Sequence, residues 1–257
     1  MSKLTDYLLN SSPEGFRRAT QSAFLASAAA GQLPKTTLGT WLANDRLYIH
    51  SYITGVGKLL SILQLPQDVP KPGAADPSSV KLLDWLVAAL VNIRREKNFF
   101  ADAAVRHGIP IHLDIDKDGS VRDDVKLPAL RRYEELFNDI RTGDNPIPWL
   151  EGAVLFYATE KAYLEAWTWT KNRLVRQDSI KDADGGALRN EFIPNWTSME
   201  FVAFVDQLGD IINDAVDEHR RARGSDADKQ LFARASKIWD EVLVAEEGFW
   251  PEVRHGV

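Results

Sequence analysis

Carboxylates flanked by aromatic residues are the side chains of this sequence whose type and spacing could support chemistry. Asp45, Tyr48 and Tyr52 follow one another at intervals of three and four residues, which places them on one face of a helix. A carboxylate buried among aromatic rings needs hydrogen-bond partners, or its pKa rises. A ligand with ring nitrogens and an exocyclic amine would provide those partners. The alternative is an exposed aspartate beside two core tyrosines, and spacing alone favours that alternative.

A second carboxylate, Glu160, lies in an aromatic stretch further along the chain. It shares a helix face with Tyr163 and Trp167, at positions i, i+3 and i+7. The alternative is a surface charge that pairs with Lys161 or with a neighbouring helix. Spacing does not separate the two interpretations.

A third carboxylate, Glu246, precedes Phe249 by three residues in the last expected helix. Pro251 disfavours the α conformation in the residue before it, so this helix should end nearby. A glutamate at such an end is usually solvated, but the adjacent Phe249 and Trp250 would also suit the wall of a pocket.

The sequence offers no convincing set of metal ligands. Asp114, Asp116, Asp118 and Gly119 match four positions of an EF-hand calcium loop, but Val125 occupies the position of its bidentate glutamate. The histidines form no Glu-x-x-His pair of the type found in di-iron bundles, and the absence of cysteine excludes thiolate ligands. We therefore expect a polar hairpin at these aspartates, and neither a metal nor another cofactor.

Apolar residues recur at helical spacing through nearly every long segment, and this pattern predicts the elements that position the carboxylates. Helices are expected over 13–31, 34–65, 78–107, 127–142, 146–173, 197–223 and 227–250. Proline-rich residues 66–77 and polar residues 178–189 should form loops, and 108–126 a short hairpin or an irregular excursion. Without an internal repeat or a long linker, residues 1–257 should form a single domain, an all-α helical bundle.

Composition restricts the partners and the location of the protein. With a net charge of −6, the chain lacks the basic clusters that neutralise nucleic-acid phosphates. No apolar run reaches the roughly 18–20 residues of a membrane span, and the N-terminus lacks the pattern of a signal peptide. We expect a soluble, cytoplasmic protein that binds neither nucleic acid nor membrane.

Three stretches resemble sequence signatures of the TenA family of thiamin-salvage proteins. The first runs from Phe24 through Gly31-Gln32-Leu33-Pro34 to Trp41, Asp45, Tyr48 and Tyr52; the second is Asn195-Trp196-Thr197-Ser198 with Glu200 and Phe201; the third is Glu246 with Phe249 and Trp250. They span most of the chain in the order that the family has. The resemblance implies the haem-oxygenase-like all-α fold, which does not necessarily bind haem.

The resemblance also implies a ligand and a pocket. In that family the pocket binds the aminopyrimidine half of thiamin or its breakdown products. Asp45 would hydrogen-bond the pyrimidine and Glu246 would act as acid and base. The other implied substrate-binding positions are aromatic: Tyr48, Tyr52, Tyr133, Tyr163, Trp196 and Phe249. TenA relatives commonly form dimers or tetramers, so a homo-oligomer is expected.

This chain departs from one branch of the family, which uses a cysteine nucleophile on the helix after Tyr133. The chain has no cysteine, and Phe156 is the best match for its place. The sequence resembles a second branch, in which a glutamate stands in for the cysteine, and Glu160 is the candidate. A carboxylate could attack as a nucleophile or activate water. Hydrolysis of an amino- or formylamino-pyrimidine is expected, rather than cleavage of intact thiamin.

Two other functions stay open at this point. The same scaffold could bind a pyrimidine, or regulate, without turnover. It could also serve a metal-dependent oxidase or oxygenase, although the histidine positions argue against that. For the hydrolase, we expect Glu160 and Glu246 to lie close enough for mutual repulsion to push their pKa values apart.

Overall fold

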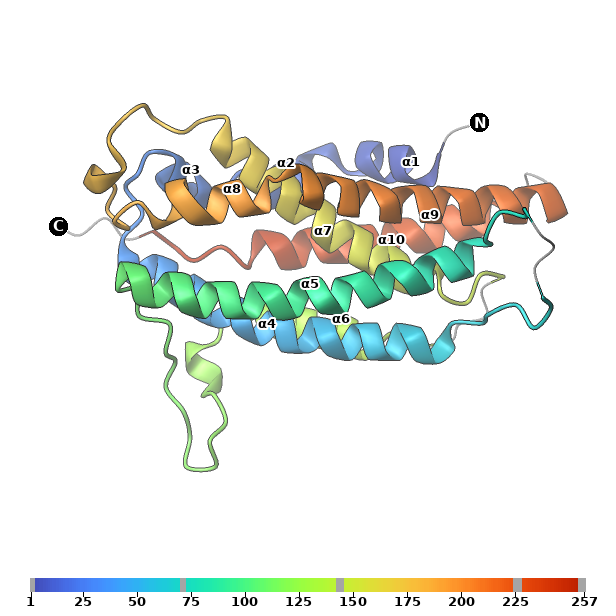
Figure 1. Cartoon of the computed structure of the whole chain (residues 1–257), viewed down its shortest axis with the longest axis horizontal. Coiled ribbons are helices and arrows are strands. Elements are labelled where there is room, and N and C mark those ends of the chain that lie inside the picture. Colours follow the sequence, from blue (N-terminus) through green and yellow to red (C-terminus); the bar gives the residue numbers. More distant parts are fainter. Residues whose placement is uncertain (1–2, 70–72, 142–145, 224–227, 254–257) are drawn as a thin grey trace.

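Long helices lie side by side along one direction in the computed structural model of the protein (Figure 1). The structure describes residues 3–69, 73–141, 146–223 and 228–253. The long helices are α4 (Lys35–Ile62), α5 (Ser78–His107), α7 (Leu150–Lys171), α9 (Met199–Arg223) and α10 (Asp228–Glu247). The shorter helices are α1 (Leu4–Ser11), α2 (Pro13–Thr20), α3 (Ala23–Ala29), α6 (Pro128–Asn138) and α8 (Ile193–Trp196).

Helix α7 lies at the centre of the bundle and packs against α2, α3, α4, α8, α9 and α10. Apolar and small residues occupy most of its faces, as expected for a helix surrounded by others. One hydrophobic core joins the helices, with Trp41, Trp85, Trp167 and Trp239 fully buried in it. No β-strand occurs among the described residues. The all-α bundle predicted from the sequence is therefore confirmed.

The prediction of a single helix over 13–31 is wrong, because the helical conformation is interrupted between α2 and α3. Residues Gln21 and Ser22 leave the helical conformation. The Ser22 hydroxyl accepts a hydrogen bond from the backbone N–H of Leu25 at 3.3 Å, which caps the start of α3. Helical periodicity continues across the break, so the pattern of apolar residues did not reveal it.

Other helix ends also differ from the expected ones. Helix α1 was not predicted, although its Leu4 and Leu8 are fully buried one turn apart. The helices expected to start at 146 and to end at 250 begin at Leu150 and end at Glu247. Helix α6 ends at Asn138, before the expected 142. Residues 70–72, 142 and 227 of the expected elements lie outside the described part of the chain.

The polar stretch 178–189 is more ordered than a plain loop. It contains a 3-10 turn, η2 (Ser179–Lys181), and leads into a π-helical segment, η3 (Leu188–Phe192). The buried Asp184 carboxylate accepts hydrogen bonds from the backbone N–H groups of Gly186 at 3.0 Å and Leu188 at 2.7 Å. A side-chain cap thus organises a segment that its composition marked only as polar.

The stretch 108–126 projects from the bundle as an extended excursion (Figure 1). An isolated antiparallel bridge joins Ile115 to Val121, and Gly119 turns the chain with a φ of +84°. The Asp118 carboxylate accepts from the backbone and hydroxyl of Ser120 at 2.9 and 2.7 Å. A 3-10 turn, η1 (Asp123–Val125), follows. The short polar hairpin expected here is therefore present.

Candidate active site

A cavity of about 130 Å³ opens between α4, α5, α6, α7, α8, the start of α9 and the C-terminal end of α10. Every side chain predicted for the site lines it: Asp45, Tyr48, Tyr52, Tyr133, Glu160, Tyr163, Trp196, Glu246 and Phe249. The helix face anticipated on α4 is thus turned inward. The structure decides between the two interpretations left open for Asp45, since this side chain is buried rather than exposed.

Glu160 reaches the cavity from the central helix α7. Its Oε1 accepts a hydrogen bond of 2.6 Å from the Tyr52 hydroxyl of α4. Burial raises the pKa of Glu160 from 4.5 to about 7; the Tyr52 hydrogen bond opposes that rise, and the charge of Glu96 adds to it. Glu160 can therefore exchange a proton near neutral pH.

Glu246 reaches the cavity from the last turn of α10. The Tyr133 hydroxyl of α6 donates a hydrogen bond to its Oε2, whereas Oε1 is buried without a partner among the described residues. Burial raises the pKa of Glu246 from 4.5 to about 7, against the effect of the Tyr133 hydrogen bond. The free oxygen leaves room for a donor that only a ligand or water would supply.

Asp45 differs from Glu160 and Glu246 in that no hydrogen bond from the described part of the chain compensates for its burial. It is buried, and no hydrogen bond to its carboxylate comes from the described residues. Burial raises the pKa of Asp45 well above its ordinary value, and the charges of Glu96, Glu246 and Glu160 raise it further. A ligand that donates hydrogen bonds would relieve this group.

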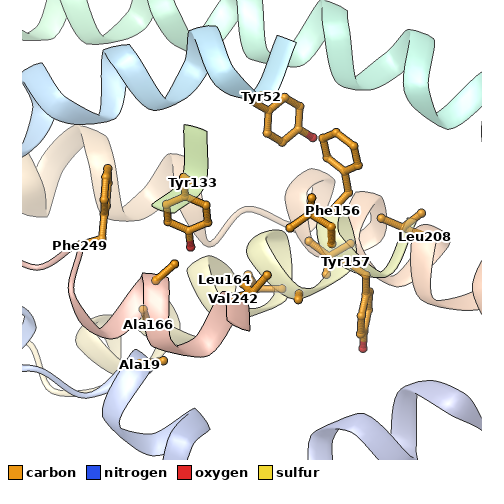
Figure 2. Close-up of a cluster of buried hydrophobic side chains, with 14 of the residues drawn as sticks. Ala19, Tyr52, Tyr133, Phe156, Tyr157, Leu164, Ala166, Leu208, Val242 and Phe249 are labelled. Carbon is orange, nitrogen blue, oxygen red and sulfur yellow. The ribbon is translucent and has the colours of Figure 1, made fainter. Parts of the chain in front are cut away.

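Aromatic rings form the remaining walls of the cavity. Tyr133 meets Tyr48 and Phe249 edge-on, with ring centroids 4.9 and 5.6 Å apart. Trp196 and Tyr163 meet in the same way at 5.5 Å. Figure 2 shows Tyr133 and Phe249 next to each other inside the bundle. Such walls suit a flat ligand, because rings stack or meet edge to face at these distances.

The position matched to the family's cysteine carries no reactive group. Phe156 of α7 is fully buried and packs edge-on against Tyr52, with centroids 4.8 Å apart (Figure 2). It is not among the residues that line the cavity. Glu160, one turn further along α7, does line the cavity. This helix therefore supplies a carboxylate to the cavity, whereas the chain has no cysteine that could supply a thiolate.

The expected splitting of the two glutamate pKa values is wrong. Both values rise to about 7, and neither carboxylate contributes to the shift of the other. Burial is the cause in each case, so each glutamate titrates on its own account rather than through mutual repulsion.

The described residues contain no group of three or more His, Cys, Asp or Glu side chains arranged to hold a metal ion. The carboxylates that line the cavity therefore face one space without forming a ligand set. No histidine lines the cavity within this part of the chain.

Comparison with known proteins supports the fold. No protein-family model matches the chain. A TenA homologue from Pyrococcus furiosus superposes with a TM-score of 0.67 at 22% identity, over 96% of this chain and 98% of that one. A TenA family transcription regulator from Silicibacter sp. TM1040 gives a TM-score of 0.67 at 15% identity, over 97% and 95%. This chain has the TenA fold. The haem-oxygenase-like bundle expected from the sequence resemblance is thereby confirmed.

One curated relative is similar in sequence. A protein of Fusarium pseudograminearum, described as a probable transcription factor, is 24% identical over 276 residues. The match covers 95% of this chain but 52% of the relative, so the chain spans about half the length of that protein. No described helix is both long enough and apolar enough to cross a membrane.

Sequence analysis did not predict two acidic residues that line the cavity, the exposed Glu200 of α9 and Glu96 of α5, and Glu96 makes the more extensive contacts. Its carboxylate accepts hydrogen bonds from the Trp196 indole and, at 3.0 Å, from the Asn195 amide. A signal was available, because Glu96 continues the inward stripe of α5 between Ile93 and Phe100, which also line the cavity. A charged residue on an apolar stripe predicts a buried polar group, as it does for Asp45.

Proposed function

We propose that the cavity binds a single-ring amino- or formylamino-pyrimidine, of the kind that thiamin breakdown yields, and hydrolyses its exocyclic C–N bond. The observation that carries this proposal is the pair Glu160 and Glu246, each with a pKa near 7 and each facing the same aromatic-walled space. The volume of about 130 Å³ is of the same order as the roughly 150 Å³ of a cavity that accommodates one benzene-sized ring, which restricts the ligand to a single ring.

Hydrolysis requires two proton movements that one carboxyl cannot perform at the same instant. A protonated glutamate gives its proton to the leaving nitrogen while an ionised glutamate takes a proton from water. The water oxygen bonds to the carbon as the C–N bond breaks, and the nitrogen leaves as ammonia or an amine. With both pKa values near 7, the singly protonated pair is most abundant around neutral pH.

Asp45 has the recognition role in this proposal. Its buried carboxyl lacks a partner among the described residues, and an aminopyrimidine presents a ring nitrogen beside an amine. A carboxyl can engage both groups at once. Tyr48, Tyr163 and Phe249 would hold the ring between aromatic surfaces.

A second candidate function is binding or regulation without turnover. It is favoured by the descriptions of two similar proteins, the probable transcription factor of Fusarium pseudograminearum and the transcription regulator of Silicibacter sp. TM1040. A metal-dependent oxidase has less support, because the described carboxylates and histidines form no ligand group. Iron or zinc that stays stoichiometric after dialysis would favour the oxidase. A cytoplasmic location and a homo-oligomer remain predictions.

The deciding experiment is incubation of the purified protein with aminomethyl- and formylamino-pyrimidines, with chromatography of the products and calorimetry of binding. Turnover that disappears in Glu160→Gln and Glu246→Gln, while binding persists, would support the hydrolase. Glu165→Gln and Glu247→Gln are matched controls, because these glutamates lie on the same helices but pair with Lys161 at 2.6 Å and Arg18 at 3.0 Å. Binding without turnover would favour the regulatory alternative, and absence of both would overturn the proposal.

A further inference from the structure

Glu96 is a cavity carboxylate to which the family signatures give no role. It lies on α5, opposite α8, and its two oxygens accept from the last two residues of that helix. Oε1 accepts from the Trp196 indole and Oε2 from the Asn195 amide, the latter at 3.0 Å. The carboxylate therefore joins two separate walls of the cavity through a planar, two-point contact.

Trp196 is held from its other sides by ring packing alone. It stacks on Phe192 with centroids 4.9 Å apart and lies 4.4 Å from the ring of Trp167. Ring contacts have broad geometric preferences, whereas the hydrogen bond from the indole N–H is directional and adds a constraint on the orientation of the ring. Glu96 thus determines how Trp196 presents its surface to the cavity.

Glu96 also has more hydrogen-bond donors than Asp45, Glu160 or Glu246. Burial raises its pKa, but the Trp196 and Asn195 hydrogen bonds and the adjacent Arg95 guanidinium lower it. Within the described residues, Glu160 and Glu246 each have one tyrosine donor and Asp45 has none. The two donors and the Arg95 guanidinium therefore favour the ionised form of Glu96.

We propose that Glu96 is a positioning residue of this site, which fixes the Trp196 wall and supplies a negative charge to the cavity that it shares with Asp45 and Glu160. The positioning role rests on the proposed function, but the charge does not. The titratable and charged groups that line the cavity with Glu96 are Arg95 on its own helix, Asp45, Tyr48 and Tyr52 from α4, Tyr133 from α6, Glu160 and Tyr163 from α7, Glu200 from α9 and Glu246 from α10.

The charge acts selectively on its neighbours. It raises the pKa of Asp45, Glu160 and Tyr163, whereas it makes no contribution at Glu246. Glu96→Gln keeps nearly the same shape and removes the charge, but its amide has a single acceptor oxygen, so one of the two hydrogen bonds is also lost. The pKa of Glu160 should consequently fall in this variant, while that of Glu246 should stay in place. A merely structural role for Glu96 would not produce this difference.

The test is carbon-13 NMR of protein labelled at the glutamate side-chain carboxyl, titrated with and without Glu96→Gln. Placing the substitution in a Glu246→Gln background isolates Glu160, and a Glu160→Gln background isolates Glu246. The proposal expects a lower Glu160 midpoint and an unchanged Glu246 midpoint. Glu200→Gln is the matched control: it removes the same charge from the exposed ion pair with Arg95 and should leave the Glu160 midpoint unchanged.

The wall is tested in the same samples through the nitrogen-15 indole signals, with Trp196 assigned by its loss in Trp196→Phe. Glu96→Gln should move the Trp196 N–H signal upfield, because the amide presents to the indole either a neutral oxygen, which binds the proton less strongly, or an NH2 group, which cannot accept it. An unchanged Glu160 midpoint, or equal shifts of both glutamate midpoints, would contradict the proposed effect of the Glu96 charge on Glu160. A Trp196 indole signal that does not move would contradict the proposed positioning of Trp196 by Glu96. Neither outcome depends on turnover, so failure of the hydrolase proposal would be recognised separately.

Discussion

The Tyr52 hydroxyl donates a 2.6 Å hydrogen bond to Oε1 of Glu160, which joins α4 to the central helix α7. A second tyrosine–glutamate pair, Tyr133 and Glu246, joins α6 to α10 across the same cavity. Each glutamate thus has one oxygen stabilised by a phenol and one that remains available. Since burial raises the pKa of both glutamates to about 7, each pair contains a carboxyl that can exchange a proton near neutral pH.

The first prediction concerns the pH dependence of turnover. We expect a bell-shaped profile with its maximum near neutral pH, because one glutamate must be ionised and the other protonated. Glu160→Gln should abolish one limb and Glu246→Gln the other, each with a loss of about 10²–10⁴-fold in kcat, the usual contribution of general acid–base catalysis. A flat wild-type profile, or full activity in either variant, would contradict the two-carboxylate mechanism.

The second prediction concerns the tyrosines. The Tyr52 hydrogen bond lowers the pKa of Glu160, so Tyr52→Phe should raise that pKa. In the pH–rate profile, the limb that disappears in Glu160→Gln should move to higher pH. Tyr133→Phe should move the other limb in the same direction through Glu246. Tyr7→Phe is the control, since this partly exposed tyrosine of α1 lies outside the cavity lining.

Much of the site was accessible from sequence because it depends on positions along single helices. The three- and four-residue intervals from Asp45 to Tyr52 placed their side chains on one face, and that face does line the cavity. The placement of Glu160 followed from its family resemblance together with the spacing to Tyr163. Helical periodicity likewise predicted most of the long helices, because their buried stripes are continuous.

What the sequence did not provide depends on contacts between distant segments. The break at Ser22 rests on a local cap that leaves the apolar period intact. The role of Glu96 depends on donors 99 and 100 residues away. The equal pKa values of Glu160 and Glu246 depend on how deeply each is buried, and spacing within one helix contains no information about that depth.

The third prediction separates recognition from catalysis. Asp45→Asn should weaken pyrimidine binding by roughly 10- to 100-fold, the range expected for loss of a charge-assisted hydrogen bond, with a much smaller effect on kcat. Calorimetric Kd and steady-state kinetics would measure the two quantities. Asp102→Asn, an exposed aspartate of α5, is the control and should change neither. A large fall in kcat at unchanged Kd would assign Asp45 to the chemical step.

The fourth prediction follows from the burial of Glu246 and concerns stability. Its pKa is about 7 in the folded protein and near its ordinary value of 4.5 in the unfolded chain. Below 4.5 both states hold the proton and the folded state suffers no penalty. Between 4.5 and about 7 the unfolded chain releases the proton first, so stability falls as pH rises. Above that range the cost levels off at about 3 kcal/mol.

Glu246→Gln removes this cost, because the amide is neutral at every pH and can still accept from Tyr133. The variant should therefore gain stability over the wild type as pH rises from about 4 to about 8, by about 3 kcal/mol in the free energy of unfolding. Denaturant titrations at the two pH values measure the difference. Glu247→Gln changes the next residue, which is exposed and paired with Arg18, so its difference from wild type should stay nearly constant. If the difference between Glu246→Gln and the wild type is also nearly constant with pH, the Glu246 carboxyl is ionised at little cost in folding stability. The proposal that Glu246 acts as an acid or base at neutral pH would then lose its physical basis.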